Sequence, residues 1–270
     1  MHIFVSPPPR HSVLQLPAPD FEVLNAPADF EKPEDVTEYF SLTALSNTRL
    51  GRRAAIDDEV TAPMVLKRLR HPFVLCEATV SVDFQVDWDQ AGLVIFAGSH
   101  PGRSDVAQLS RSLRISHAPA SSISYRNTSK WARIALELIA GEVNISTLVA
   151  NPKCGVDWAS TPAWPFYHPS QLEETSMPSI RLKFEKIGLD LWIWFMVPDL
   201  ESTFGGTPSP ESVRRQWRKC REVVNFFDPM LVKGGLWIGC YASRPTEVEV
   251  TNNGIPENGL FAEFEDLEIL

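Results

Sequence analysis

Apolar and polar positions alternate along much of the chain after about residue 36, which predicts β-strands. The clearest segment is CEATVSVDFQVDW (76–88), where Ala, Val, Val, Phe and Val share one face and Glu, Thr, Ser, Asp and Gln share the other. Residues 90–98 follow after a very short turn, so the two segments are predicted to form a hairpin. Further strands are predicted at 142–150, 180–188, 189–197, 235–243 and 260–269.

Two segments have a helical character. Residues 131–141 (WARIALELIAG) fit either a helix or a strand, and periodicity alone does not decide between them. Residues 209–227 predict a surface helix, with Ser209 as cap and Pro210 in the first turn. The apolar stripe of that helix would be Val213, Trp217, Cys220, Val224 and Phe227.

The second row of the strand at 189–197 departs from the usual pattern. One face of this strand is aliphatic. The opposite face carries Trp192 and Trp194, where a face exposed to solvent would show polar residues. Two interpretations stay open. The indoles line a ligand cleft, or they pack beneath the 209–227 helix, an N-terminal arm or the 97–129 stretch.

The strand pattern predicts one domain, because no convincing linker or internal repeat divides the chain. Residues 1–35 are rich in proline and are expected to form an extended surface arm. Residues 36–270 are expected to form a single β-sandwich. Within it, residues 97–129 lack a strand pattern and read as a long loop or insertion, with a possible short helix at 104–113.

Charge and composition narrow the classes of partner. The 270-residue chain has a formal net charge of −9, which argues against nucleic acid as a partner. Its longest apolar runs are far shorter than the ~20 residues of a membrane-spanning helix, and its start lacks a secretory apolar region. We therefore expect a cytoplasmic protein with reduced cysteines. The oligomeric state is left open.

The sequence offers no motif for a metal or an organic cofactor. The six histidines lack metal-ligand spacing. Phosphate loops, dinucleotide fingerprints and Gly-x-Ser-x-Gly elbows are also missing from the sequence. We expect no cofactor and no metal site.

Three stretches together resemble a known family. They are DWDQAGLVIF (87–96), KWARIALELIAG (130–141) and the ending from GLWIGCYASRP to LFAEFEDLEI (235–269). The chain from about residue 20 to residue 270 resembles the regulation-of-enolase-protein family, a set of concanavalin A-like jelly-roll domains of mostly uncharacterised function. The resemblance implies two antiparallel sheets packed face to face, with a concave outer surface. In related lectins and glucanases that surface binds sugar chains.

Combined with this fold, strand parity predicts a single cleft built from the rows opposite the core. Arg133 and Glu137 would orient polar groups or transfer protons there, although a structural ion pair is an open alternative. The candidate ligand-binding residues are Gln90, Trp131, Lys183, Trp192, Trp194 and Trp237. The candidate catalytic residues are Asp83, Arg133, Glu137 and Tyr241.

Three functions fit such a cleft. The first is binding of a small metabolite or a glycan. The second is a cofactor-free cyclase, isomerase or lyase, rather than a hydrolase, because the acidic stretch 263–268 does not place three carboxylates on one strand face. The third is a metabolic regulator that acts through protein binding, as the family name suggests.

Overall fold

The computed structural model describes nine stretches of the chain. They are residues 21–54, 57–70, 72–98, 100–101, 130–152, 155–163, 177–197, 217–248 and 259–270. The first 20 residues of the expected arm, most of the 97–129 stretch with its possible helix 104–113, and residues 198–216 lie outside the described residues.

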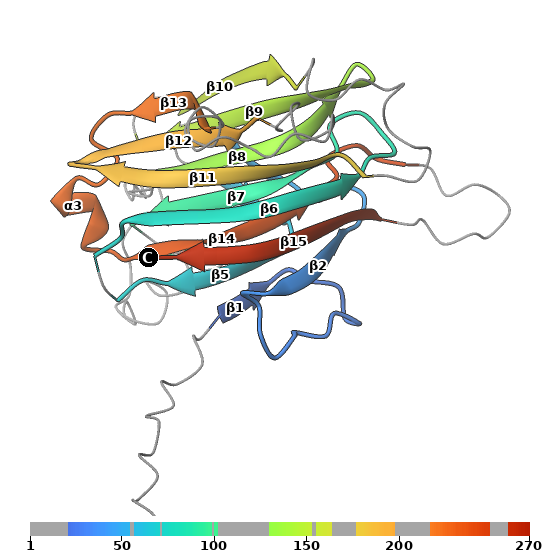
Figure 1. The fold of residues 1–270 in the computed structure, drawn as a ribbon, viewed down its shortest axis with the longest axis horizontal. Coiled ribbons are helices and arrows are strands. Elements are labelled where there is room, and N and C mark those ends of the chain that lie inside the picture. The colour runs from blue at the N-terminus through green and yellow to red at the C-terminus, as the bar shows by residue number, and fades with distance from the viewer. Residues whose placement is uncertain are drawn as a thin grey trace, which may run out of the picture.

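The described chain forms a β-sandwich of two antiparallel sheets, as predicted (Figure 1). In spatial order, the seven-stranded sheet holds β1 (Phe21–Leu24), β5 (Met64–Arg68), β14 (Leu236–Ser243), β7 (Gln90–Ala97), β8 (Lys130–Ile139), β9 (Glu142–Asn151) and β10 (Gly155–Pro162). The six-stranded sheet holds β13 (Trp217–Val223), β12 (Asp190–Met196), β11 (Ser179–Ile187), β6 (Leu75–Asp83), β15 (Leu260–Ile269) and β2 (Tyr39–Ala44).

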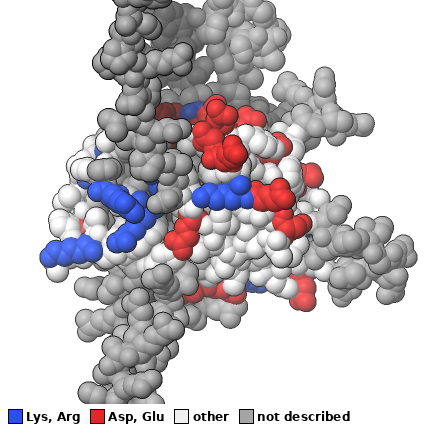
Figure 2. Space-filling model, turned by 90° about the horizontal axis from the view of Figure 1, so that it is seen from below, with Lys and Arg blue, Asp and Glu red and all other residues white. Residues whose placement is uncertain are grey.

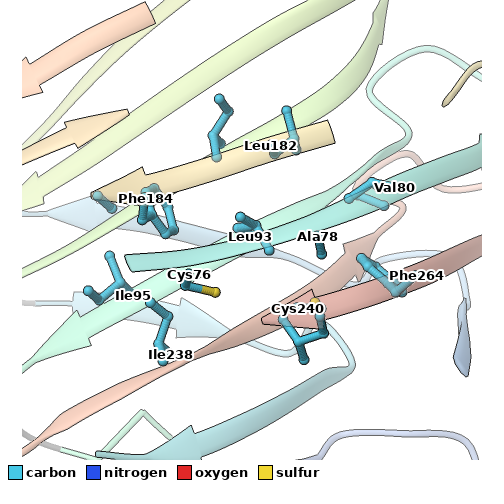
Figure 3. Packing of buried hydrophobic residues seen from close by; sticks show 14 of the residues in the cluster. Cys76, Ala78, Val80, Leu93, Ile95, Leu182, Phe184, Ile238, Cys240 and Phe264 are labelled. Carbon is cyan, nitrogen blue, oxygen red and sulfur yellow. The ribbon is translucent and has the colours of Figure 1, made fainter. Parts of the chain in front are cut away.

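The main core lies between the sheets, where the aliphatic rows meet. Ala78 and Val80 of β6 are fully buried together with Leu93 and Ile95 of β7, which belong to the opposite sheet (Figure 3). Their neighbours Glu77, Thr79 and Ser81 point the other way and are only partly buried. The period-two pattern therefore selected the core rows correctly, because each strand turns alternate side chains to opposite faces.

The predicted strands are confirmed within one or two residues at their ends, apart from the first. β6 ends at Asp83 rather than at residue 88, because residues 84–89 form the passage to β7. The ambiguous segment 131–141 is a strand, β8, whose backbone pairs with β7 and β9 along its length.

The predicted hairpin between 76–88 and 90–98 is wrong. β6 pairs with β11 and β15, whereas β7 pairs with β14 and β8, so the short connection crosses from one sheet to the other. A short loop restricts the distance between two strands but does not force them into one sheet.

The predicted helix 209–227 is also wrong where the structure describes it. Trp217–Val223 form β13, the edge strand that pairs with β12 across a bulge at Ile193 and Trp194. Helix propensity is a weak preference. The open edge of β12 offers backbone hydrogen bonds, and these stabilise this segment as a strand. The described residues contain one short helix, α3 (Pro229–Val232), and no helix that is long and apolar enough to cross a membrane.

Two further strands lie outside the main sheets. β3 (Leu50–Ala54) and β4 (Asp57–Val60) pair with each other and form a small hairpin. Leu50 belongs to a second apolar cluster with the outward row of the seven-stranded sheet, including Phe96, Trp131 and Trp237. β1 lies within the stretch expected to be a surface arm, and it pairs with β5 instead.

Charged side chains are mixed on the side of the sandwich where β1, β2 and β5 lie. Seen from below, the described surface carries both blue and red groups, with most of the blue on the left (Figure 2). The overall formal charge of the chain is −9.

The close approach of β7 to β8 generates the first prediction. A Cβ at Gly92 would lie 2.0 Å from the carbonyl oxygen of Ile134, whereas a Cβ at Gly51 would meet nothing within 4 Å. We expect Gly92→Ala to lower the free energy of unfolding by about 3 kcal/mol, because the overpacked atom meets backbone. Gly51→Ala should change it by less than about 0.5 kcal/mol. Urea denaturation of both variants measures the difference, and equal midpoints would contradict the prediction.

Candidate functional site

A cleft of about 710 Å³ opens on the outer face of the seven-stranded sheet. Its floor comes from β7 and β8, and its sides come from β10, the passage before β7, the β3–β4 hairpin and the turn after β14. The lining residues that matter most for its chemistry are Arg52, Trp88, Gln90, Arg133, Glu137 and Trp158.

Strand register explains why polar residues meet at this floor. Gln90 of β7 lies directly opposite Glu137 of β8. Arg133 lies two residues before Ala135 and four before Glu137, so both charged side chains leave the same face of β8. Trp158 reaches this side from β10, where it is paired with Leu148 of β9, the residue opposite Arg133.

A chain of buried hydrogen bonds runs along the floor. Arg133 Nη1 donates to the hydroxyl of Tyr241 at 2.6 Å, and that hydroxyl donates to Gln90 Oε1 at 3.1 Å. Gln90 Nε2 in turn lies 3.4 Å from the carbonyl oxygen of Trp88, to which it donates. Burial raises the pKa of Tyr241 well above its ordinary value, although the adjacent Arg133 opposes this. The phenol therefore stays protonated at neutral pH and serves as a donor.

Glu137 is a buried carboxylate of the floor whose polar contacts are long. Its side chain is 2% exposed, yet its closest contacts within the described chain are the indole nitrogen of Trp158 at 3.5 Å and Arg133 Nη2 at 4.0 Å. Arg133 is 4% exposed, and its Nε finds no hydrogen-bond partner among the described residues. A buried carboxylate normally accepts several short hydrogen bonds, so this carboxylate has acceptor capacity left for a guest.

Two exposed tryptophans flank this floor, and sequence reasoning missed both. Trp88 is 46% exposed and Trp158 is 44% exposed, which is unusual for the largest apolar side chain. Each lines the cleft. A tryptophan in the very short passage between two strands was the available signal for Trp88, because tight turns favour small polar residues.

Trp131 does not contribute to the cleft, contrary to the prediction. It is fully buried beneath the β3–β4 hairpin, and its indole nitrogen donates to Asp58 Oδ1 at 3.0 Å. Asp58 also accepts from Arg52 Nε at 2.5 Å and from Arg52 Nη2 at 3.0 Å. Trp131 therefore helps to hold the hairpin on the sheet, and the hairpin forms one side of the cleft.

Two other predicted residues lie away from the cleft. Trp237 is on the outer face of the seven-stranded sheet, but it contacts Arg68 and the ring of His100 instead. Asp83 ends β6 in the other sheet, where it pairs with Phe261. Tyr241 is on the same outer face, on β14, but it is fully buried and outside the lining, and its hydroxyl accepts from Arg133.

Trp192, Trp194 and Lys183 are on the outer face of the six-stranded sheet, so the expectation of one shared surface is wrong. The two indole rings lie 5.6 Å apart, and each has a lysine over it. Lys219 Nζ is 4.0 Å from the Trp192 ring, and Lys183 Nζ is 5.3 Å from the Trp194 ring. Through these cation–π contacts, the two lysines and the two indoles form one cluster on β11, β12 and β13. This cluster is on the side of the sandwich away from the cleft.

The site's charges balance. Its lining includes three arginines and three glutamates, namely Arg49, Arg52, Arg133, Glu59, Glu137 and Glu247. Within the described part of the chain, no group of three or more His, Cys, Asp and Glu side chains is placed to hold a metal ion. The arrangement can donate and accept hydrogen bonds beside two aromatic surfaces.

Comparison with known proteins supports the fold. No family model and no curated protein matches the sequence. A functionally unknown protein from Saccharomyces cerevisiae is similar in structure, with a TM-score of 0.52 and 13% identity over 93% of this chain and 95% of that one. At that identity, the similarity shows the two-sheet architecture alone.

Two further solved structures are less similar to this chain. A GH43 protein from Bacillus licheniformis has a TM-score of 0.44 and 12% identity over 84% of this chain and 32% of its own. An alginate lyase from Pseudomonas aeruginosa has a TM-score of 0.40 and 12% identity over 91% and 87%. Neither bears on what this cleft binds.

The buried phenol generates the second prediction. Tyr241→Phe removes the acceptor of Arg133 Nη1, so we expect the free energy of unfolding to fall by about 1–3 kcal/mol. Tyr39→Phe is the matched control, because the Tyr39 hydroxyl donates to Glu263 at an exposed site on the other sheet. The control should change the free energy by less than about 0.5 kcal/mol. Denaturant unfolding checks both, and a neutral Tyr241→Phe would contradict the prediction.

Proposed function

We propose that the cleft binds a small polar metabolite or a glycan. The observation that carries this proposal is Glu137, a carboxylate that is 2% exposed and makes only long contacts at the floor of an open cleft. Burying a charge without short hydrogen bonds is costly, and a ligand hydroxyl that donates to the carboxylate offsets this cost.

The two flanking indoles favour a ligand with a flat or weakly polar ring face. Trp88 and Trp158 expose large aromatic surfaces with few rotatable bonds, so a ligand can stack on them at low entropic cost. A sugar ring fits this description, because its C–H face is apolar and its rim carries hydroxyl groups. The hydroxyl rim would then meet Glu137 and Arg133.

The balance of charge favours a neutral ligand. Three arginines and three glutamates line the cleft, and at least two of the arginines have carboxylate neighbours, at Asp58 and Glu137. A phosphate or a polyanion would meet both signs, whereas an uncharged polyhydroxylated molecule uses donors and acceptors together.

Substitution of the floor and of one wall tests this proposal. Glu137→Gln should weaken binding about 10- to 100-fold, because a hydrogen bond to a charged group contributes about 1.5–3 kcal/mol. Trp158→Ala should weaken it about 3- to 10-fold through lost stacking. The measurement is a screen on an array of neutral oligosaccharides and a metabolite panel, followed by calorimetric titration of each binder.

Two variants on the other sheet serve as controls. Trp192→Ala removes one indole from the six-stranded sheet, and Glu268→Gln changes an exposed carboxylate on β15. Both should bind as the unmodified protein does. Equal loss in Trp158→Ala and Trp192→Ala, or saturable binding that is indifferent to Glu137→Gln, would contradict this location of the site.

Catalysis in the same cleft is the second candidate, favoured by the position of Arg133 beside Glu137. Their side chains lie 4.0 Å apart, close enough for the carboxylate to accept a proton while the guanidinium stabilises negative charge that develops on a substrate oxygen. This arrangement suits an isomerase, cyclase or lyase without a cofactor.

Turnover separates the two candidates. If the protein is an enzyme, a ligand found in the screen is converted without added cofactor, and Glu137→Gln lowers kcat at saturating ligand by about 10²–10⁴-fold. Proton NMR of the reaction mixture follows the conversion. A ligand that binds and is recovered unchanged would rule out catalysis and leave the binding proposal standing.

Three further proposals rest on the sequence alone. They are membership of the regulation-of-enolase-protein family, a cytoplasmic location, and the alternative role of a metabolic regulator that binds another protein. A pull-down with the unmodified protein and with Glu137→Gln tests the last, because a protein partner bound elsewhere would be retained by both.

A further inference from the structure

Trp88 has an unfavourable backbone conformation. Its φ is 75°, in the left-handed region that favours glycine and asparagine. The other described non-glycine residues with positive φ are three asparagines, one aspartate and one alanine, so Trp88 is the bulky exception. A conformation of this kind persists only where surrounding contacts enforce it, and such residues cluster at functional sites.

Backbone hydrogen bonds hold Trp88 against β8. The Trp88 N–H donates to the carbonyl oxygen of Leu138 at 2.7 Å, and the Leu138 N–H donates to the carbonyl oxygen of Asp89 at 2.9 Å. Just beyond, Asp87 Oδ1 accepts from the N–H of Gly141 at 3.0 Å. The passage from β6 to β7 is thus fixed to the β8–β9 turn on one side.

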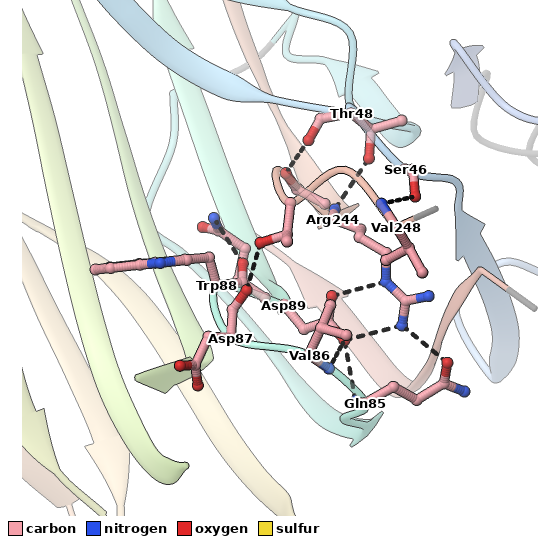
Figure 4. A network of polar contacts seen from close by, with 12 residues as sticks. Ser46, Thr48, Gln85, Val86, Asp87, Trp88, Asp89, Arg244 and Val248 are labelled. Carbon is pink, nitrogen blue, oxygen red and sulfur yellow. Dashed lines mark hydrogen bonds and ion pairs between the residues drawn. The ribbon is translucent and has the colours of Figure 1, made fainter. Parts of the chain in front are cut away.

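A buried ion pair fixes the other side of this passage (Figure 4). Asp89 is fully buried and Arg244 is 1% exposed. Arg244 Nε is 2.8 Å from Asp89 Oδ1, and its Nη2 is 2.9 Å from Oδ2, which makes a bidentate pair. Asp89 Oδ2 also accepts from the N–H groups of Gln85 and Val86, at 3.0 and 3.1 Å.

The same pair also fixes the turn after β14, which lines the cleft next to this passage. Arg244 follows β14, and its N–H donates to Thr48 Oγ1 at 2.9 Å. The next three residues, 245–247, line the cleft beside this passage, and the Thr246 hydroxyl donates to the carbonyl oxygen of Asp87 at 2.6 Å. In Figure 4 the Trp88 indole points away from the ion pair, which therefore holds the backbone without touching the ring.

We infer that Asp89 and Arg244 are positioning residues, which impose the left-handed backbone of Trp88 and hold the adjoining turn after β14 at the same side of the cleft. The inference rests on the proposed function, because it assigns the strained indole to ligand contact. Trp88 leaves 46% of its surface exposed, and asparagine or glycine fits this backbone with less strain, so stability alone gives little reason for a tryptophan here.

Fluorine NMR tests the positioning role without any ligand. The full chain is labelled with 5-fluorotryptophan, and Trp88→Phe and Trp192→Phe assign two of the resonances. In Arg244→Gln and Asp89→Asn, the Trp88 resonance should shift or broaden, whereas the Trp192 resonance on the other sheet should stay in place. An unchanged Trp88 resonance in both variants would overturn the inference, whatever the outcome of the binding screen.

If the ion-pair variants fail to fold, a second pair of variants tests whether the Trp88 ring is needed for stability. Trp88→Asn places a residue that tolerates positive φ at the strained position, and its melting temperature should be equal to or higher than that of the unmodified protein. Trp158→Asn, at a similarly exposed strand position, should lower the melting temperature by comparison. A fall of several degrees for Trp88→Asn alone would show that the ring supports the fold, and would overturn the inference.

Discussion

Burial of alternate side chains between two sheets is the constraint on which the rest of this structure depends. Each strand turns one row towards the core, so the other row must find an environment of its own. On the seven-stranded sheet that outer row is partly apolar, and the β3–β4 hairpin covers Trp131 and its neighbours as a second cluster. The polar end of the same row remains open as the floor of the cleft.

Arg133 and Glu137 show how this constraint places charged side chains at the floor of the cleft. Both are buried on the sheet, yet they lie 4.0 Å apart instead of forming a short bidentate pair. Replacing a buried ion pair with apolar residues is often neutral or stabilising, so stability gives little reason for this arrangement. Arg133 is instead bonded to the Tyr241 hydroxyl, which donates to Gln90, and this loose geometry agrees with the proposed binding of a ligand group to both charged side chains.

The tryptophans on the two outer faces of the sandwich are covered to different degrees. On the six-stranded sheet, Trp192 and Trp194 are covered by lysines, which are themselves close to Glu222 and Glu185. On the seven-stranded sheet, Trp88 and Trp158 keep nearly half of their surface exposed beside an incompletely bonded carboxylate. The yeast protein has a similar fold, but a fold alone does not decide which of the two faces binds a ligand.

The sequence by itself determined seven of the strands and the two faces of each, because the period of two is a local property of extended chain. Ala78 and Val80 were assigned to the core correctly, and Gln90, Arg133 and Glu137 to the outer face that holds the cleft. Only the tertiary structure decided which sheet each strand joins. That choice depends on pairings between segments far apart in the chain, which parity does not encode. It separated Trp192 from Glu137, made a strand of Trp217–Val223, and brought Trp88 and Trp158 to the cleft.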